Sequence, residues 1–388
     1  MSDAFVIGAA HTRFGEQWSD SFRSLMTRAG LAAIEDAGIQ GEDVDEVFVG
    51  SMSMGKVVGQ EHIAPLLLDG AGLADLHLPA TRVEAAGASG GLAFRQAVQA
   101  IRSGSADVVV VGGVEKMSEV SDQDAAAIRA SGLDQEWEHF FGATDAAMHA
   151  LVTKLHMAEY GTTRQQLAAV PVKNHAHGAK NPLAQFQRAI KPEMVTGSPA
   201  VAEPLTLFDC APVGDGAAVL VLANQEVADG HAKAVKVAGT GQASDTLALH
   251  DRSTYTSWSA TVQASRRAYQ QAGISAGDIQ VAEVHDGYSI GEILAIEDLG
   301  LVKKGDGGPA TLEGRTTFGG DVVVNPSGGL KARGHAPGAT GIAQLAELTW
   351  QLRGDAGERQ VEDARIGVAH NTGGTGATAV VTVLEGGL

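Results

Sequence analysis

The stretch AGIQGEDVDEVFV at residues 37–49 decides how this chain folds, because its pattern returns as AGISAGDIQVAEV at residues 272–284. In each copy an Ala-rich segment ends at a glycine and is followed by an acidic turn and an apolar strand. Asp43 of the first copy corresponds to Asp278 of the second. The two copies lie about 235 residues apart, far too long a period for a solenoid, so they indicate a duplicated lobe.

Two further matches follow in the same order. SGGL at residues 89–92 recurs at residues 327–330, in each case next to an expected helix, and DGAAVLVL at residues 215–222 resembles GATAVVTVL at residues 376–384. A single match of this length arises by chance, but three in one order predict two similar lobes.

Strand and helix patterns alternate along the first lobe. Ala-rich helical stretches at residues 21–38 and 92–104 each end at a glycine, the residue that favours a left-handed helix end. Such alternation is typical of layered α/β folds, and the nearly unbroken apolar run at residues 107–113 suits a strand covered on both faces. The expected strands are AFVIGAA (4–10), DEVFVGSM (45–52), ADVVVVGGVE (106–115) and AAVLVLA (217–223).

The first lobe is interrupted by a segment with little strand pattern. We divide the chain into a first lobe of residues 1–118 and 205–230, an insertion of residues 119–204, and a second lobe of residues 231–388. The insertion is rich in His, Gln and Met, and its apolar spacing predicts helices within residues 137–161 and 162–182. It is either a ligand-contacting cap or a structural lid, and its histidines, His156, His175 and His177, are expected in the lid or its loops.

Composition excludes several classes of function. The chain has 388 residues and a formal net charge of −18, which argues against nucleic acid and anionic membranes as main partners. Its single cysteine excludes an intrachain disulfide and a cysteine-based zinc site. The first residues, MSDAFVIGAA, lead directly into an apolar strand, and no run of about 18 apolar residues occurs, so we expect a soluble cytoplasmic protein.

Four small-residue segments are candidates for a common site, because ligands of α/β bodies bind where strands end and helices begin. They cover residues 84–94, 283–289, 325–341 and 368–377, and the last three carry His285, His335 and His370. Each histidine alone is more often structural than catalytic, but their shared placement favours a function. Their spacing lacks a short paired ligand motif, so we expect no metal site.

The first of these segments, RVEAAGASGGLAF, turns into a helix at a corner that has Gly87 where a catalytic side chain is normally displayed. Cys210, in LTLFDCAPVGDGAA, lies among apolar neighbours ahead of a strand and is expected to be an inert buried thiol.

These motifs together resemble the thiolase superfamily over the whole chain. GGVEKMS (112–118) is similar to the family's GG-x-E-x-MS motif, and NPSGGLKARGHAPGATG (325–341) to its GHP-x-GATG loop, with departures at Ala336 and Pro337. HDGY (285–288) stands where sterol-carrier-type thiolases have His-Asp-Cys-Phe, and archaeal acetoacetyl-CoA thiolases read VEAACASGGLAFR at the Gly87 segment. The resemblance implies a duplicated α-β-α-β-α layered fold with two mixed five-stranded sheets.

Thiolases join or split acyl-CoA units through an acyl-cysteine held at a helix N-terminus, and the resemblance places Gly87 at that cysteine. Gly287 likewise replaces a second cysteine. The resemblance makes His335 the activating base, puts His285 in place of an oxyanion-hole asparagine, and puts His370 where a second cysteine exchanges the α-carbon proton. We therefore expect an acetyl-CoA acetyltransferase type of site, acting in acetyl-CoA condensation or acetoacetyl-CoA thiolysis, that is impaired in acyl-enzyme formation.

Two alternatives stay open. One is a cysteine-independent lyase that splits CoA thioesters by retro-aldol chemistry, and the other is a scaffold that binds acyl-CoA without turnover. The resemblance implies coenzyme A or acyl-CoA as substrate with no covalently bound cofactor. It also implies a homodimer or dimer of dimers, because the edge of the strand at residues 107–113 would otherwise need another cover. The implied partners are a small OB-fold protein and a hydroxymethylglutaryl-CoA synthase.

Overall fold

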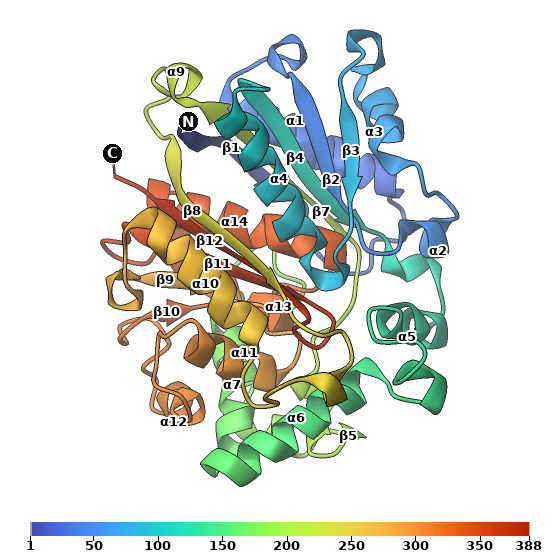
Figure 1. Cartoon of the computed structure of the whole chain (residues 1–388), viewed down its shortest axis with the longest axis vertical. Coiled ribbons are helices and arrows are strands. Elements are labelled where there is room, and N and C mark those ends of the chain that lie inside the picture. The colour runs from blue at the N-terminus through green and yellow to red at the C-terminus, as the bar shows by residue number, and fades with distance from the viewer. Residues whose placement is uncertain (1, 388) are drawn as a thin grey trace.

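The computed structural model describes residues 2–387 and contains one large mixed sheet (Figure 1). Its ten strands run in the order β10-β9-β11-β12-β8-β1-β7-β4-β2-β3, and β5 and β6 form a separate pair. The strands are β1 (Ala4–His11), β2 (Glu46–Gly50), β3 (Ala80–Val83), β4 (Val108–Glu115), β5 (Ala200–Ala202), β6 (Leu205–Thr206), β7 (Gly216–Asn224), β8 (Val235–Ser244), β9 (Val281–Glu283), β10 (Val323–Val324), β11 (Ile366–Gly373) and β12 (Thr378–Glu385).

The pairing pattern is the same in both halves of this sheet. β1, β7 and β4 pair antiparallel while β4, β2 and β3 pair parallel, and β8, β12, β11, β9 and β10 repeat this sequence of directions. The two mixed five-stranded units that we expected are therefore present. They are joined into one sheet by a short antiparallel pairing of β1 with β8, in which Phe5 faces Lys236 and Val6 faces Val235.

Helices cover the sheet in the expected five layers. α4 and α14 pack on each other between the two halves, where Phe94 and Ile342 share one core with Leu220 and Val235. α1 and α3 cover the outer face of the first half, and α10 and α11 that of the second (Figure 1). The helices are α1 (Phe22–Ala37), α2 (Met54–Val58), α3 (Ile63–Ala71), α4 (Ser89–Ser103), α5 (Asp122–Ala130), α6 (Asp145–Tyr160), α7 (Arg164–Gly178), α8 (Pro192–Thr196), α9 (Gln225–Ala228), α10 (Ser259–Ala272), α11 (Ser289–Asp298), α12 (Gly307–Leu312), α13 (Gly329–Ala332) and α14 (Pro337–Arg353).

The sequence repeat at residues 37–49 and 272–284 has a local physical basis. Asp43 accepts the backbone N–H of Gln40 at 2.8 Å, and Asp278 accepts that of Ser275 at 2.8 Å, so both carboxylates cap the same kind of turn ahead of β2 and β9. The SGGL copies both lie at helix starts, but the helices differ. The first copy opens α4, whereas the second leads into the short α13, and α14 is the helix that pairs with α4.

One expectation about the strand edges is wrong. β4, which contains residues 107–113 apart from Asp107, lies between β2 and β7 and is buried along its whole length. The edges of the sheet are β3 and β10, so the dimer argument that rested on this strand loses its support.

The insertion, residues 119–204, forms α5 to α8 and β5, and α6 and α7 lie below the sheet in Figure 1. Of the two placements that we expected for His156, His175 and His177, lid or loop, the structure has all three buried on helices of the insertion. His156 on α6 contacts Glu297 at 3.1 Å, and His177 on α7 contacts the backbone oxygen of Asn325 at 3.0 Å. These contacts dock the insertion on the second half of the chain.

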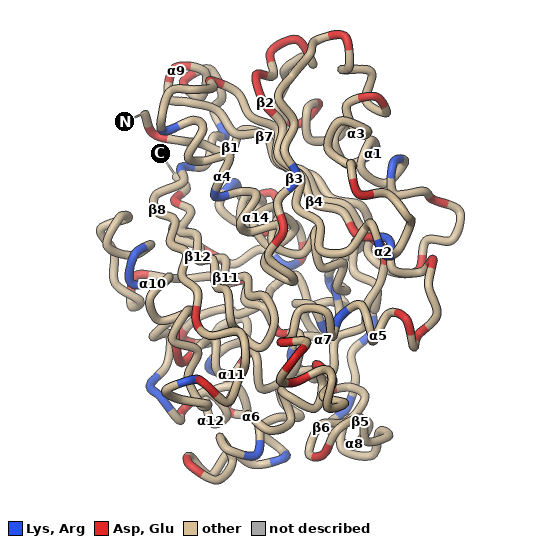
Figure 2. Tube along the Cα trace, turned by 45° about the vertical axis from the view of Figure 1, so that its right-hand side comes forward, with Lys and Arg blue, Asp and Glu red and all other residues tan. Residues whose placement is uncertain are grey.

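Charged side chains are distributed over the whole trace, with Lys and Arg scattered rather than gathered along one element (Figure 2). No helix within residues 2–387 is long and apolar enough to cross a membrane.

Candidate active site

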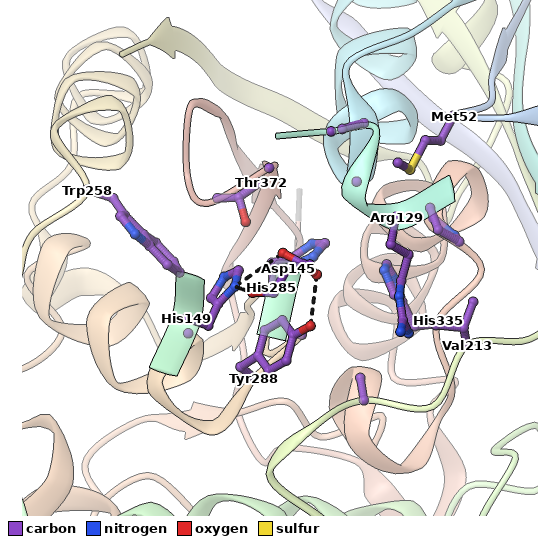
Figure 3. Close-up of a pocket in the computed structure, with 18 residues that line it drawn as sticks. Met52, Arg129, Asp145, His149, Val213, Trp258, His285, Tyr288, His335 and Thr372 are labelled. Atoms are coloured by element: carbon purple, nitrogen blue, oxygen red, sulfur yellow. Dashed lines mark hydrogen bonds and ion pairs between the residues drawn. The ribbon is translucent and has the colours of Figure 1, made fainter. Parts of the chain in front are cut away.

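All four candidate segments meet at one pocket (Figure 3). They supply Gly87, His285, His335 and Thr372 to its wall, while the insertion supplies residues from α5 and α6. The lining residues are Met52, Ala86, Gly87, Arg129, Gly132, Asp145, His149, Ala211, Val213, Trp258, His285, Gly287, Tyr288, Gly291, His335, Pro337, Thr372 and Gly374.

The backbone at Gly87 is packed for a residue without a side chain. A Cβ atom placed on Gly87 lies 2.7 Å from the backbone oxygen of Thr372 and 3.0 Å from Cε1 of His285. The corresponding Cβ on Gly287 lies 3.6 Å from its nearest neighbours, an ordinary contact. The pocket therefore has room for a side chain at residue 287, whereas neighbouring groups fill that space at residue 87.

His285 presents an N–H group to the pocket. The amide of Asn371 accepts the backbone N–H of Gly91 at 3.0 Å through Oδ1, which fixes Nδ2 as the donor to the Gly87 backbone oxygen and to Nδ1 of His285, each at 3.0 Å. Because Nδ1 accepts this bond, the proton of the neutral ring is on Nε2. The pKa of His285 is held well below its ordinary value, first by burial and then by His335. A neutral ring with a fixed N–H is a suitable donor to an oxyanion.

His335 has the opposite arrangement. Its Nδ1 lies 2.8 Å from the hydroxyl of Thr340, and that hydroxyl donates its own proton to the backbone oxygen of Ala336 at 3.0 Å. Nδ1 must therefore be the donor, which leaves Nε2 without a proton and free to act as a base. Burial, aided by Arg129 and Arg333, lowers the pKa of His335 to about 3, so the ring is neutral at pH 7.

The loop that carries His335 is held by the motif at residues 112–118. Glu115 is fully buried and accepts the backbone N–H groups of Met52, Ser53 and Gly338, each at 2.9 Å. This carboxylate joins the start of α14 to the loop after β2. The motif thus positions the His335 segment and adds no group to the pocket wall itself.

A second polar group in the pocket comes from the insertion. Tyr288 donates its hydroxyl to Asp145 at 2.9 Å, and the ring of His149 stacks on that of Tyr288 with centroids 4.2 Å apart (Figure 3). Burial, followed by Asp145, raises the pKa of Tyr288 well above 10. Burial by itself would raise the pKa of Asp145, but the opposing effects of His149, Tyr288 and Arg129 are larger. The pKa of Asp145 is therefore below its ordinary value.

Sequence reasoning missed Asp145 and His149. Tyr288 is both a core residue, 7% exposed, and part of the pocket wall. The spacing of Asp145 and His149, four residues apart on one helix, is the signal that could have indicated a shared face. Arg129 gave no such signal, because nothing in the sequence links α5 to the other segments.

The structure does not bring His370 into the pocket. Its ring is fully buried, and Nε2 contacts the hydroxyl of Thr261 on α10 at 2.9 Å, while burial lowers its pKa to about 3. Adjacent residues of a strand face opposite sides of a sheet. Asn371 therefore points toward His285, and His370 points toward the outer helix. This position contradicts the α-carbon proton exchange that we assigned to His370.

Cys210 is a protonated thiol away from Gly87. It is half-buried rather than fully buried, burial raises its pKa, and it lies in the wall of a neighbouring cavity instead of the pocket. Within residues 2–387, no group of three or more His, Cys, Asp and Glu residues is arranged to hold a metal ion.

Comparison with known proteins covers nearly the whole chain. Residues 4–226 match the family model "Thiolase, N-terminal domain", and residues 241–386 match "Thiolase C-terminal domain-like". An acetyl-CoA acetyltransferase of Methanothermobacter thermautotrophicus is 53% identical over 99% of this chain and 100% of the relative. Sterol carrier protein 2 of Homo sapiens is 34% identical over 99% of this chain and 72% of its own length.

Two solved structures have the same fold as this chain. The Ltp2-ChsH2(DUF35) aldolase is 27% identical, with a TM-score of 0.86 over 99% of this chain and 98% of that one. Human mitochondrial 3-ketoacyl-CoA thiolase in complex with CoA is 17% identical, with a TM-score of 0.77 over 100% of this chain and 98% of that one. The second likeness concerns the fold alone.

Proposed function

This chain belongs to the thiolase family, and from that premise we propose that it breaks or forms the carbon–carbon bond next to a coenzyme A thioester without an acyl-cysteine intermediate. By family it is a thiolase-type acyltransferase, and CoA thioesters are the substrates of that family. The finer question is which reaction the site performs with Gly87 at the position of the nucleophile.

One observation carries the proposal. The pocket holds two neutral imidazoles of opposite polarity, an Nε2 base on His335 and an Nε2–H donor on His285, with ring centroids 5.3 Å apart. A base and an oxyanion donor are the two groups that a thioester enolate requires. No nucleophile is needed for this chemistry, and the close approach of Thr372 to Gly87 leaves little space for one.

The reaction that fits is retro-aldol cleavage of a 3-hydroxyacyl-CoA. His335 takes the hydroxyl proton, the C2–C3 bond breaks, and its electron pair forms the enolate, whose oxygen accepts the N–H of His285. The carbonyl fragment leaves, and the protonated His335 returns its proton to C2. One hydroxyacyl-CoA thus gives one aldehyde or ketone and one shorter acyl-CoA, with no other reactant.

Asp145 favours the protonated intermediate of this cycle, since its negative charge raises the pKa of His335 against the effects of burial and of Arg129. The likeness to an aldolase at 27% identity also supports the assignment.

A second candidate is acetyl transfer between CoA thioesters. The 53% and 47% identical archaeal relatives, both named acetyl-CoA acetyltransferase, favour it. The two-step route of the family is closed to this chain as long as residue 87 is glycine, because glycine carries no group that can be acetylated. A scaffold that binds acyl-CoA without turnover is the non-enzymatic alternative.

The test is proton exchange. The protein is incubated with acetyl-CoA in D₂O, and deuterium at the acetyl methyl group is followed by NMR, since exchange requires the enolate and no acyl-enzyme. We expect exchange in the unaltered protein, a loss of about 100-fold or more in His335→Asn, and unchanged exchange in His370→Asn, the matched control outside the pocket. Release of aldehyde and acetyl-CoA from a 3-hydroxyacyl-CoA panel then identifies the cleavage. Binding of acetyl-CoA with no exchange would favour the scaffold instead.

We also propose a second, small subunit. The name of the aldolase neighbour couples Ltp2 with ChsH2(DUF35), which supports a partner protein for this chain, and the family resemblance implies a small OB-fold protein as that partner. Co-expression with a DUF35 protein from the same genome, followed by size-exclusion chromatography, tests this partner and also whether the chain alone is a homodimer or a dimer of dimers. The same experiment with hydroxymethylglutaryl-CoA synthase tests the third proposed component.

A further inference from the structure

Arg129 brings a positive charge to the wall of the pocket. It extends from α5 and lies beside His335 and Val213 (Figure 3). Its charge acts on the carboxylate of Asp145 and on the rings of His335 and Tyr288, which places the guanidinium close to the reacting groups.

This arginine lacks a counterion. Among residues 2–387 no carboxylate lies within ion-pair distance of Arg129, and no hydrogen bond from its guanidinium is found, although Nε is buried. Asp145, the carboxylate on the same pocket wall, is already bonded to Tyr288 and His149. Arg129 is partly buried, and its buried Nε has no hydrogen-bond partner, which a bound anion would supply.

The position of Arg129 limits which anion it binds. The thioester must lie between His285 and His335 for the proposed chemistry, and Arg129 is next to His335. The phosphates of coenzyme A are separated from the thioester by the whole pantetheine arm, so they cannot reach this arginine when the thioester is in place. The anion therefore belongs to the acyl part of the substrate.

Space for such an acyl part lies next to Arg129. Arg129, Ala211 and Val213 line both the pocket and a second cavity, whose wall includes the apolar side chains of Ile190 and Phe208. An acyl chain that enters this cavity passes the guanidinium.

We propose that Arg129 binds a carboxylate carried by the acyl group, so that the substrates of this enzyme are CoA thioesters of dicarboxylic or other carboxylate-bearing acids. The inference rests on the proposed function only in that it requires a CoA thioester in the pocket. A planar guanidinium binds a carboxylate through two parallel hydrogen bonds, which gives both affinity and selection against neutral acyl chains.

Binding, rather than turnover, tests the inference. Dissociation constants are measured by titration calorimetry for succinyl-CoA and glutaryl-CoA and for the uncharged pentanoyl-CoA and hexanoyl-CoA, which have similar lengths. We expect the unaltered protein to bind at least one charged thioester about 10- to 100-fold more tightly than its neutral counterpart, the range of a charge-assisted pair. Arg129→Gln removes this preference and leaves the affinity for the neutral thioesters unchanged, while Arg129→Lys keeps part of it.

Arg188→Gln is the matched control, because Arg188 lies in the wall of the second cavity away from the pocket and its loss leaves the preference intact. Three results would each overturn the inference about Arg129 and leave the proposed function untouched. The unaltered protein could bind charged and neutral thioesters equally, the preference for charged thioesters could survive Arg129→Gln, or Arg188→Gln could abolish that preference. Failure of every CoA thioester to bind overturns the proposed function as well. Circular dichroism of both glutamine variants verifies that they are folded.

Discussion

Replacing Gly87 with cysteine separates the two candidate functions, because it adds the thiol that a thiolase needs at the position where this chain is most tightly packed. The new Cβ lies 2.7 Å from the backbone oxygen of Thr372, below the 3.0 Å that real Cβ atoms essentially never pass. Thr372 is part of β11 and pairs with Ala379 of β12, so its carbonyl can move only with the hairpin. His285 limits movement on the other side, at 3.0 Å.

Overpacking of this kind costs about 1–3 kcal/mol of the free energy of unfolding. We expect Gly87→Cys to lose that amount in urea denaturation. The matched control Gly287→Cys, whose Cβ meets its neighbours at 3.6 Å, changes by less than about 1 kcal/mol. We further expect no acetoacetyl-CoA thiolysis and no acetyl adduct in the mass of the Gly87→Cys protein, because the shifted His285 ring no longer presents its N–H group to the thioester oxygen.

The opposite outcome refutes this reasoning. In that outcome the Gly87→Cys protein is as stable as the unaltered protein, gains thiolysis and carries one acetyl adduct. The unaltered protein is then a thiolase that is inactive because of a single residue. Acetyl transfer then replaces enolate chemistry without an acyl-enzyme as the function of the scaffold, and the packing around Gly87 has no bearing on mechanism.

Three further outcomes follow from the hydrogen bonds and pKa values of the histidines. Thr340→Val removes the acceptor that fixes the His335 tautomer, so proton exchange in D₂O falls about tenfold while the affinity for acetyl-CoA is retained; equal exchange in the variant contradicts the tautomer assignment. Asn371→Ala frees Nδ1 of His285 and lowers exchange by a similar factor of about ten, with the nitrogen chemical shifts of His285 reporting the change of tautomer. His370 has its pKa lowered from 6.5 to about 3, so the unfolded chain binds more protons than the native protein between these values, and stability falls as the pH is lowered from 6.5 toward 3. Urea denaturation across this range therefore shows the unaltered protein losing up to about 1.4 kcal/mol per pH unit more than His370→Asn, and parallel pH profiles contradict the burial of a neutral ring.

The sequence by itself determined the features that depend on local pattern. Apolar runs and glycine helix ends predict the alternation of strands and helices, and the repeat at residues 37–49 and 272–284 predicts two similar halves, because the same short segment encodes the same capped turn and strand in each. The four motif segments also identify the pocket, since strand ends at one edge of a sheet meet in space. Gly87, His285 and His335 were found in this way.

Only the tertiary structure decided what those residues can do. The polarities of His285 and His335 depend on Asn371 and Thr340, and the amide of Asn371 reaches the oxygen of Gly87 from 284 residues away in the sequence. The exclusion of His370 depends on which side of β11 faces the pocket, which a strand of uniformly buried residues does not reveal.

The same is true of the groups that the insertion contributes. Arg129, Asp145 and His149 enter the pocket because α6 docks on α11 of the second half and α5 packs against α6, through contacts that carry no local signature. Local pattern predicts elements and their order, whereas side chains far apart in the sequence, brought together by packing, set the tautomers, the charges and the free space on which the chemistry depends.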